Sequence, residues 1–300
     1  NGSWNQIGND IDGEASGDSF GRSVSLSSDG NTVAIGAPNN DGNGNTSGHV
    51  RIFNYNGGSW TQLGQDIDGE FIDDWSGYSV SLSSDGNIVA IGAFQNYGNG
   101  SHAGHVRVYE YNNGSWNKLG QDIDGESSGD QSGKSVSLSS DGTIVAIGAP
   151  GNYGQNIGQN TGHVRVYEYN NGSWNQLGQD IDGESYGDYS GKSVSLSSDG
   201  TILAIGAPEN DGNGSNSGNV RIYSYNGSSW SQLGLDIDGE AIYDQSGYFL
   251  SLSSDGNTLA IGAPSNSENG QYSGHVRIYN YNGTSWSQLG NDIDGEAAYN

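Results

Sequence analysis

Carboxylates recur at one fixed spacing in five places along the chain. Each set has the sequence Asp-Ile-Asp-Gly-Glu, with a further aspartate four residues after the glutamate. Oxygen ligands at positions one, three, five and nine, with a glycine that lets the chain turn, suit a calcium loop, although an EF-hand has its glycine at position six and a glutamate at twelve. The candidate calcium ligands are Asp10, Asp12, Glu14, Asp18, Asp66, Asp68, Glu70, Asp74, Asp122, Asp124, Glu126, Asp130, Asp180, Asp182, Glu184, Asp188, Asp236, Asp238, Glu240 and Asp244.

A salt bridge competes with calcium for these carboxylates. A Val-Arg pair recurs once for each acidic set, and its arginines make up most of the 9 basic residues. A planar guanidinium can hold a carboxylate through two parallel hydrogen bonds. We therefore expect inter-blade ion pairs, and favour them over calcium, at Arg51, Arg107, Arg165, Arg221 and Arg277.

Other reactive groups are few. Four histidines share one repeated position, His49, His105, His163 and His275, but the fourth unit has Asn219 there. That change argues against a required metal ligand or proton shuttle, and we expect a hydrogen bond at the start of a strand instead. The chain has no cysteine, and its serines have no partnered base. The sequence therefore predicts a protein that is not an enzyme.

The acidic sets and arginines belong to a tandem repeat. Phased tryptophans recur every 56 to 58 residues, at Trp4, Trp60, Trp116, Trp174, Trp230 and Trp286. They mark five full units and the opening of a sixth. Because a unit this small and this polar buries too little apolar surface to fold alone, neighbouring units must pack against each other.

Each unit has the alternation of four short strands. In the first unit these are residues 23–27, 32–37, 49–55 and 59–67, separated by a Ser-Asp-Gly turn, a Gly/Asn-rich loop and an Asn-Gly turn. Such units are typical of propeller blades. We predict one all-β repeat domain over 1–300, a β-propeller of about five blades at approximately 23–70, 79–126, 135–184, 193–240 and 249–296. The alternative is an open stack of the same sheets, whose ends would need caps or partners.

Two short motifs resemble those of a known family. Phe20-Gly21 and Gly36-Ala37-Pro38 are similar to the signatures of the FG-GAP repeat, the blade unit also found in the head of integrin α chains. The Gly-Ala-Pro motif recurs at 148–150, 206–208 and 262–264, whereas the second unit has Gly-Ala-Phe at 92–94. The resemblance covers all five units and implies a propeller, but it implies no particular function.

One feature of the family is missing. Many FG-GAP repeats carry a calcium loop DxDxDGxxD between the first two strands, and here that connection is only Ser-Ser-Asp-Gly. We therefore interpret the single acids of these hairpins as turn residues. They are Asp29, Asp85, Asp141, Asp199 and Asp255.

Charge and surface motifs restrict the partners. A net charge of −26 opposes nucleic acids and anionic membranes and favours cations. No apolar run approaches the ~20 residues that cross a bilayer. N-glycosylation triplets begin at Asn45, Asn99, Asn113, Asn171, Asn213, Asn226 and Asn282, and also at Asn1. All are expected in loops or turns, and an extracellular or cell-surface location is predicted.

Two functions remain open. We favour a structural or adhesive platform that assembles with itself into filaments or a surface layer, or that binds cell-surface and matrix components. The alternative is a glycan-binding module in which Tyr97, Tyr153 and Tyr272 stack on sugar rings. Two of the five corresponding loops have no aromatic residue, so equivalent sugar sites in every unit are not expected.

The arrangement of the strands gives two further expectations. The acidic connections and the Gly/Asn-rich loops should share one face of the propeller, opposite the Ser-Asp-Gly turns. Residues 1–14 nearly duplicate 283–296 and would be a surplus outer strand. We expect that strand to close the ring, to join successive domains or to pair with a neighbouring molecule.

Overall fold

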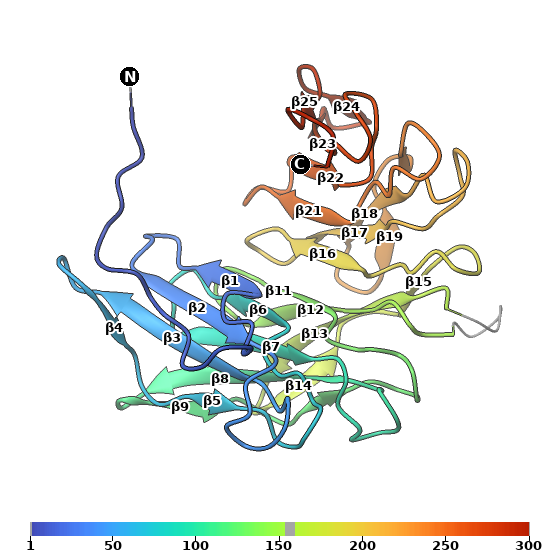
Figure 1. The fold of residues 1–300 in the computed structure, drawn as a ribbon. Helices are drawn as coiled ribbons and strands as arrows, with labels where there is room; N and C mark the ends of the chain where they lie inside the picture. Colours follow the sequence, from blue (N-terminus) through green and yellow to red (C-terminus); the bar gives the residue numbers. More distant parts are fainter. Residues whose placement is uncertain (1, 154–159, 300) are drawn as a thin grey trace.

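The computed structural model describes residues 2–153 and 160–299, and every regular element in these ranges is a β-strand. The described residues accordingly include no helix able to span a membrane. The strands form five antiparallel sheets that follow one another in chain order (Figure 1). The prediction of an all-β fold with about five blades is confirmed.

The five sheets, here called blades 1 to 5, have equivalent strands. Blade 1 contains β1 (Ser23–Leu26), β2 (Thr32–Ala37), β3 (His49–Tyr55), β4 (Trp60–Gln62) and β5 (Ile67–Asp68). Blade 2 contains β6 (Ser79–Leu82), β7 (Ile88–Ala93), β8 (His105–Asn112), β9 (Ser115–Lys118) and β10 (Ile123–Asp124). Blade 3 contains β11 (Ser135–Leu138), β12 (Ile144–Ala149), β13 (His163–Asn170), β14 (Ser173–Gln176) and β15 (Ile181–Asp182). Blade 4 contains β16 (Ser193–Leu196), β17 (Ile202–Ala207), β18 (Asn219–Tyr225), β19 (Trp230–Gln232) and β20 (Ile237–Asp238). Blade 5 contains β21 (Phe249–Leu252), β22 (Thr258–Ala263), β23 (His275–Tyr281), β24 (Trp286–Gln288) and β25 (Ile293–Asp294).

The outer strand of each blade differs from the prediction. The expected continuous strand 59–67 is split into β4 and β5, which both pair with β3. Between them Gly64 has a φ of 77°, and a Cβ there would lie 2.8 Å from Cδ1 of Trp116 in the next blade. The break therefore lets the backbone approach the neighbouring tryptophan, which glycine permits.

The hairpin turns depend on an aspartate and a serine. The Asp29 carboxylate accepts hydrogen bonds from the Ser27 hydroxyl at 2.7 Å and the Asn31 amide at 3.0 Å. The Ser27 oxygen accepts the Thr32 amide at 2.9 Å. These bonds hold the pKa of Asp29 below its usual value, with the Ser27 bond contributing most. The structure thus places this aspartate in a tight turn.

Adjacent hairpin turns are tied into a row. The Ser28 amide donates to the Ser84 carbonyl at 2.9 Å, Ser84 to Ser140 at 2.8 Å, Ser140 to Ser198 at 2.8 Å and Ser198 to Ser254 at 2.9 Å. We call this side of the propeller the turn face. The row therefore links all five blades through equivalent residues.

The acidic connections lie on the opposite side, here called the loop face. Asp124 of an acidic connection pairs with His105, the first residue of β8. His105 also pairs with Ala93, the last residue of β7, whereas the Asp85 turn precedes β7. The connection and the turn therefore lie at opposite ends of the blade. Loop and connection are bonded together, since the Asn99 amide donates to the Gly125 carbonyl at 2.9 Å. The prediction that acidic connections and Gly/Asn-rich loops share a face is confirmed.

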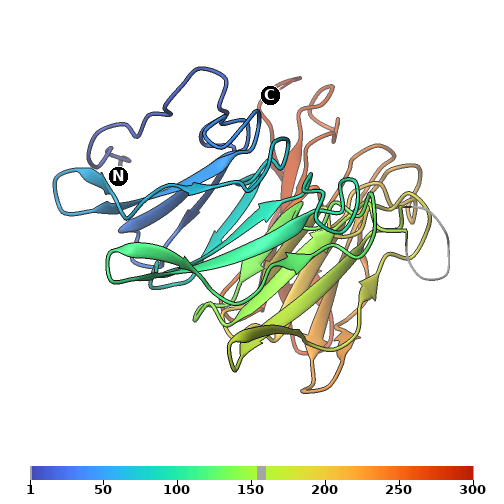
Figure 2. The ribbon, with the colours of Figure 1, turned by 90° about the horizontal axis from the view of Figure 1, so that it is seen from below.

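The blades fan out around a central cavity. Their inner strands β1, β6, β11, β16 and β21 contact one another in that order, and all five contribute to the cavity lining. Figure 2 shows the sheets side by side in chain order. Apolar clusters fill the space between successive blades; between blades 1 and 2 they include Ile52 and Ile67 on one side and Leu82, Ile91 and Trp116 on the other. The hydrophobic core is therefore a series of inter-blade joints.

Blades 1 and 5 each have one side that no other blade covers. Leu26 is 59% exposed, whereas its equivalent Leu82 is 8% exposed. At the other end Ile293 is 59% exposed, whereas its equivalent Ile67 is 4% exposed. We call these surfaces the leading face of blade 1 and the trailing face of blade 5. The fan is thus open between its first and last blades.

Residues 2–22 form no strand, which corrects the expected surplus outer strand. The Trp60 indole donates to the Ile7 carbonyl at 3.1 Å, and Ile11 packs on the apolar cluster of blade 1. The outer edge of blade 5 is held by its own β24 and β25. The first copy of the duplicated segment therefore lies against blade 1 and does not replace the terminal copy.

Candidate metal-binding joints between the blades

Each repeated arginine reaches the acidic connection before its own blade. In blade 2 the Arg107 Nη2 donates to the Asp68 carbonyl at 2.8 Å, and its Nη1 lies 3.6 Å from Glu70 Oε1. The guanidinium thus divides its donors between a backbone carbonyl and a carboxylate, and does not form the expected bidentate pair. The same ion pair joins Arg51 to Glu14, Arg165 to Glu126, Arg221 to Glu184 and Arg277 to Glu240, at 3.5 to 3.9 Å.

One arginine does not offset all the carboxylates of a joint. Burial, and then the nearby Asp122 charge, raises the pKa of Asp124. Burial raises the pKa of Glu126 as well, although Arg165 acts in the opposite direction. Crowded carboxylates of this kind favour a bound cation.

The repeated histidines lie among these carboxylates. Ligand atoms of Glu126, His163 and Asp180 lie within 4.8 Å of one another, and those of Glu126 and Asp180 come from two successive connections. Equivalent clusters are Glu14, His49 and Asp66; Glu70, His105 and Asp122; and Glu240, Glu268, His275 and Asp292. In the fourth unit Asn219 is buried in the histidine position, and its Oδ1 has no partner among the described residues. An amide oxygen there remains a possible type of ligand.

The joint around His163 coincides with a cavity. This cavity, of about 170 Å³, is lined by Glu126, His163 and Asp180, together with Asp130, Asp182 and Tyr153. Burial, with Arg165 nearby, lowers the pKa of His163 to about 4. The imidazole is therefore neutral at physiological pH and can offer a lone pair. In the blade 2 joint, by contrast, Lys118 binds Asp122 at 2.9 Å and would compete with a cation.

The ninth-position aspartates bond the backbone of their own connection, although Asp130 also lines the His163 cavity. The Asp74 carboxylate accepts the Phe71 amide at 2.9 Å and the Asn96 side-chain amide at 3.0 Å. Its equivalents are also buried, at Asp18, Asp130, Asp188 and Asp244. None of the clusters within 4.8 Å among residues 2–153 and 160–299 contains them. The candidate ligands therefore do not come from one continuous loop. The fifth-position glutamate of one connection and the first-position aspartate of the next lie together beside a histidine.

The donor set has clear chemical preferences. Imidazole suits zinc and related transition ions, whereas calcium takes oxygen ligands. One histidine and two carboxylates therefore fit zinc better than the calcium that the sequence suggests. Sequence reasoning missed these histidines because Asn219 interrupts their series. The histidines contact the acidic connection because a two-residue strand of that connection pairs with their strand, as where Asp182 pairs with His163. The alternation of apolar and polar residues does not predict so short a strand.

We expect a divalent cation to stabilise EDTA-treated protein. An ion that binds only the folded state raises its stability by RT ln(1 + [L]/Kd), so the melting temperature should rise by several degrees at saturation. The shift should need less zinc than calcium. Scanning calorimetry with EDTA, calcium and zinc measures this directly.

The control for this prediction exists within the chain. His163→Asn introduces the residue that the fourth unit carries at Asn219, and it should reduce the zinc shift while leaving the melt in EDTA similar. If the melts with EDTA, calcium and zinc coincide, the joints hold no cation and the arginine pairs alone account for the contacts between connection and blade.

The remaining predicted positions lie at the surface. All seven glycosylation asparagines within the described residues are exposed, and Asn1 lies outside them. The Asn99 and Asn213 amides donate to backbone carbonyls and so help to hold their loops. Tyr97, Tyr153 and Tyr272 are about half exposed; Tyr97 bonds His102 at 2.9 Å, and Tyr272 lines a cavity of about 500 Å³ with Tyr243.

Solved structures of low sequence identity share the fold. A Bacteroides uniformis protein described as a 6-phosphogluconolactonase aligns with a TM-score of 0.55 and 12% identity, over 91% of this chain and 85% of that chain. Kuenenia stuttgartiensis hydrazine synthase aligns with a TM-score of 0.56 and 16% identity, over 86% of this chain and 64% of that chain. At these identities the likeness concerns the fold alone.

Sequence comparison identifies the repeat. No curated protein matches the chain significantly. The family model described as the FG-GAP repeat matches residues 11–53 and 181–223, which cover the start of the first unit and its equivalent in the fourth. Both segments run from an acidic connection to the strand that carries the repeated arginine. The chain therefore carries FG-GAP repeats at these two segments, and its five sheets form the blades of a β-propeller.

Proposed function

We propose that this chain is a non-enzymatic, extracellular structural and adhesive propeller that assembles end to end with further copies of itself. The observation that carries the proposal is the pair of uncovered end faces. Each face has the composition of one half of an internal joint. A joint is heterologous, so repeating it between copies gives a linear array rather than a closed dimer.

The two halves of a joint can be compared residue by residue. Between blades 1 and 2, one half is Ala34, Val50, Ile52 and Ile67, and the other is Val80, Leu82, Val89, Ile91 and Trp116. The trailing face of blade 5 presents the first set as Ala260, Val276, Ile278 and Ile293. The leading face of blade 1 carries the second set as Val24, Leu26, Val33, Ile35 and Trp60, of which Val33 and Ile35 are buried in a cluster that Ile11 and Phe20 pack against. A second copy therefore brings the same side chains that already pack four times within the chain.

The trailing face also has a recess of suitable position. A cavity of about 340 Å³ is lined by Phe249, Gly262, Val276 and Ile293. In the internal joints this place receives the backbone of the next unit, as where Gly77 lies against Gly36. The equivalent segment of a second copy is Phe20-Gly21. We therefore expect the Phe-Gly pair of a second copy to occupy this recess.

The duplicated segment sets a condition on assembly. If copies meet in the register of the internal joints, residues 1–14 of one copy and 283–296 of the other need the same position beside the incoming blade. One of them must be displaced. Asp12 and Glu14 of the first copy hold Arg51, but Asp294 and Glu296 of the terminal copy can supply the same groups. The rest of the first copy is held by the Trp60–Ile7 bond and by Ile11, and Trp4 is fully exposed, so we expect the N-terminal copy to move.

Two variants with opposite defects test the assembly. Leu26→Asp blocks the leading face and Ile293→Asp blocks the trailing face, and both positions are exposed in the single chain. We expect wild-type chains to form oligomers whose size grows with concentration, and each variant alone to be monomeric. An equimolar mixture should give dimers, because each variant keeps one functional face. Light scattering coupled to size exclusion measures all three states.

Leu235→Asp is the control, because Leu235 is 86% exposed but lies between β19 and β20 of blade 4 and so belongs to neither end face. This variant should assemble as wild type does. Monomeric wild-type protein at all concentrations, or variants that assemble normally, would show that the end faces do not bind a second copy.

Other features support the extracellular part of the proposal. Seven exposed glycosylation triplets suit a secreted protein, and the high negative charge suits a soluble surface component. Glycan binding is the second candidate, because Tyr272 and Tyr243 are exposed beside Glu240 and Asp244 at one cavity. Specific signals on a glycan array from monomeric protein would favour that candidate.

A further inference from the structure

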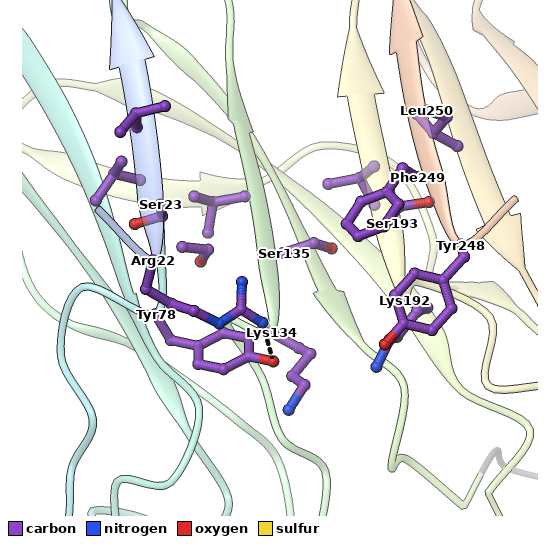
Figure 3. Close-up of a pocket in the computed structure, with 15 residues that line it drawn as sticks. Arg22, Ser23, Tyr78, Lys134, Ser135, Lys192, Ser193, Tyr248, Phe249 and Leu250 are labelled. Carbon is purple, nitrogen blue, oxygen red and sulfur yellow. Dashed lines mark hydrogen bonds between the residues drawn. The ribbon is translucent and has the colours of Figure 1, made fainter. Parts of the chain in front are cut away.

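Five equivalent residues surround the mouth of the central cavity. They immediately precede the inner strands and are Arg22, Tyr78, Lys134, Lys192 and Tyr248 (Figure 3). The cavity measures about 460 Å³. Two residues further along each inner strand the cavity lining is aliphatic, at Val24, Val80, Val136, Val194 and Leu250. We call the five residues of the mouth the basic ring.

The basic ring contains the basic residues that form no salt bridge with a carboxylate of the described residues. Of the 9 basic residues, the five joint arginines and Lys118 form ion pairs with carboxylates. The others are Arg22, Lys134 and Lys192, and no salt bridge reaches them from residues 2–153 or 160–299. Three unpaired cations thus lie together in a chain whose net charge is −26.

Aromatic rings hold these cations in place without neutralising them. The Arg22 guanidinium donates to the Tyr78 hydroxyl at 2.6 Å and lies 4.3 Å from the centre of that ring. The Lys134 ammonium lies 3.4 Å from the centre of the Phe94 ring and 4.3 Å from that of Tyr78. Lys192 lies 4.8 Å from the centre of the Tyr248 ring. Such contacts position a cation but leave its charge available.

We propose that the basic ring binds an oxyanion, namely the carboxylate, sulfate or phosphate group of a small molecule. The ammonium and guanidinium groups would donate charge-assisted hydrogen bonds to it. The aliphatic layer below would contact an apolar part of the same molecule. The inner serines are already committed between blades, since Ser79 donates to the Gly133 carbonyl at 2.8 Å and Ser135 to Gly191 at 2.8 Å. Recognition therefore rests on the cations.

The charges that face Lys134 make binding dependent on pH. Burial, then Lys192 and Arg22, lower the pKa of Lys134 to about 7. The rings of Tyr78 and Phe94 also contact Lys134. The half-buried Glu209 interacts electrostatically with Lys192. A bound anion favours the protonated lysine, so affinity should fall as pH rises through 7 towards 9 and level off below 7.

Isothermal titration tests the site with defined probes. Inorganic phosphate, sulfate and glucuronate are titrated separately, with neutral glucose as the reference. We expect saturable binding of one anion per chain at pH 6.5, weaker at pH 8.5. Lys134→Gln and Lys192→Gln should each reduce affinity by about tenfold or more through the loss of one charge-assisted contact. Lys118→Gln, which removes a lysine outside the ring, should bind as wild type does.

Each outcome has a definite meaning. Binding of phosphate and sulfate alone identifies a free inorganic oxyanion as the ligand, and binding of glucuronate identifies an organic acid. Circular dichroism melts verify that the glutamine variants remain folded. The proposal is overturned if none of the three anions binds, if glucose binds equally well, or if folded Lys134→Gln and Lys192→Gln variants keep the wild-type affinity.

Discussion

Replacing Trp116 by alanine is expected to lower the free energy of unfolding by ~3–5 kcal/mol, the usual result for a large aromatic residue in a core. Trp116 is 4% exposed and packs in the joint between blades 1 and 2, beside the Tyr111 ring at 5.2 Å. Its indole donates to the Leu63 carbonyl at 2.7 Å, so truncation also leaves a buried acceptor unpaired.

Trp4 provides the matched control, because it occupies the same repeat position but is fully exposed. Trp4→Ala should change stability by no more than about 0.5 kcal/mol. Urea unfolding followed by circular dichroism compares the two variants without relying on the tryptophan signal. Equal effects at both positions would mean that the joints do not depend on their tryptophans.

The second large effect is expected at the glycine of the Gly-Ala-Pro motif. A Cβ at Gly148 would overlap the Gly191 carbonyl oxygen of the next blade, which is backbone and cannot rotate away. Gly148→Ala must therefore separate blades 3 and 4, and we expect a loss of about 3 kcal/mol, at the upper end for overpacked cores. The midpoint of thermal unfolding measures it.

The same substitution at Gly262 should be almost neutral in the single chain. A Cβ there would meet only atoms of Phe249, at 3.6 Å, because no further blade covers the trailing face. In assembled copies, however, Gly262 would face an incoming backbone, so Gly262→Ala should reduce oligomer size while leaving monomer stability unchanged. A comparable loss of stability at both positions would show that the glycine is needed within its own blade and not for contact with the next one.

The strands could be predicted because their signals are local. Alternation in residues 23–27 and 49–55 and the Ser-Asp-Gly turn each act within one blade, and the structure reproduces them as β1, β3 and the Asp29 turn. Phased tryptophans gave the number of blades. The break at Gly64 was not predictable, because its cause is Trp116 of the following blade.

The candidate sites depend on contacts between blades, and this is why sequence reasoning recovered them only in part. Glu126 and Asp180 lie far apart along the chain and meet only because successive connections flank the same histidine. The basic ring could not be predicted for another reason. Its position holds arginine, tyrosine, lysine, lysine and tyrosine in the five units, so no single residue type repeats there.

The row of hydrogen bonds along the turn face has a mechanical consequence. The Ser28, Ser84, Ser140 and Ser198 amides tie successive turns, so two blades cannot part at that face without breaking a backbone hydrogen bond. The loop face is tied as well, because the Ser76 amide donates to the Ser47 carbonyl of the preceding blade at 3.0 Å and the Ser132 amide to the Ala103 carbonyl at 2.9 Å. Backbone hydrogen bonds at both faces therefore resist bending of the fan in either direction. We expect the five blades to move as one body.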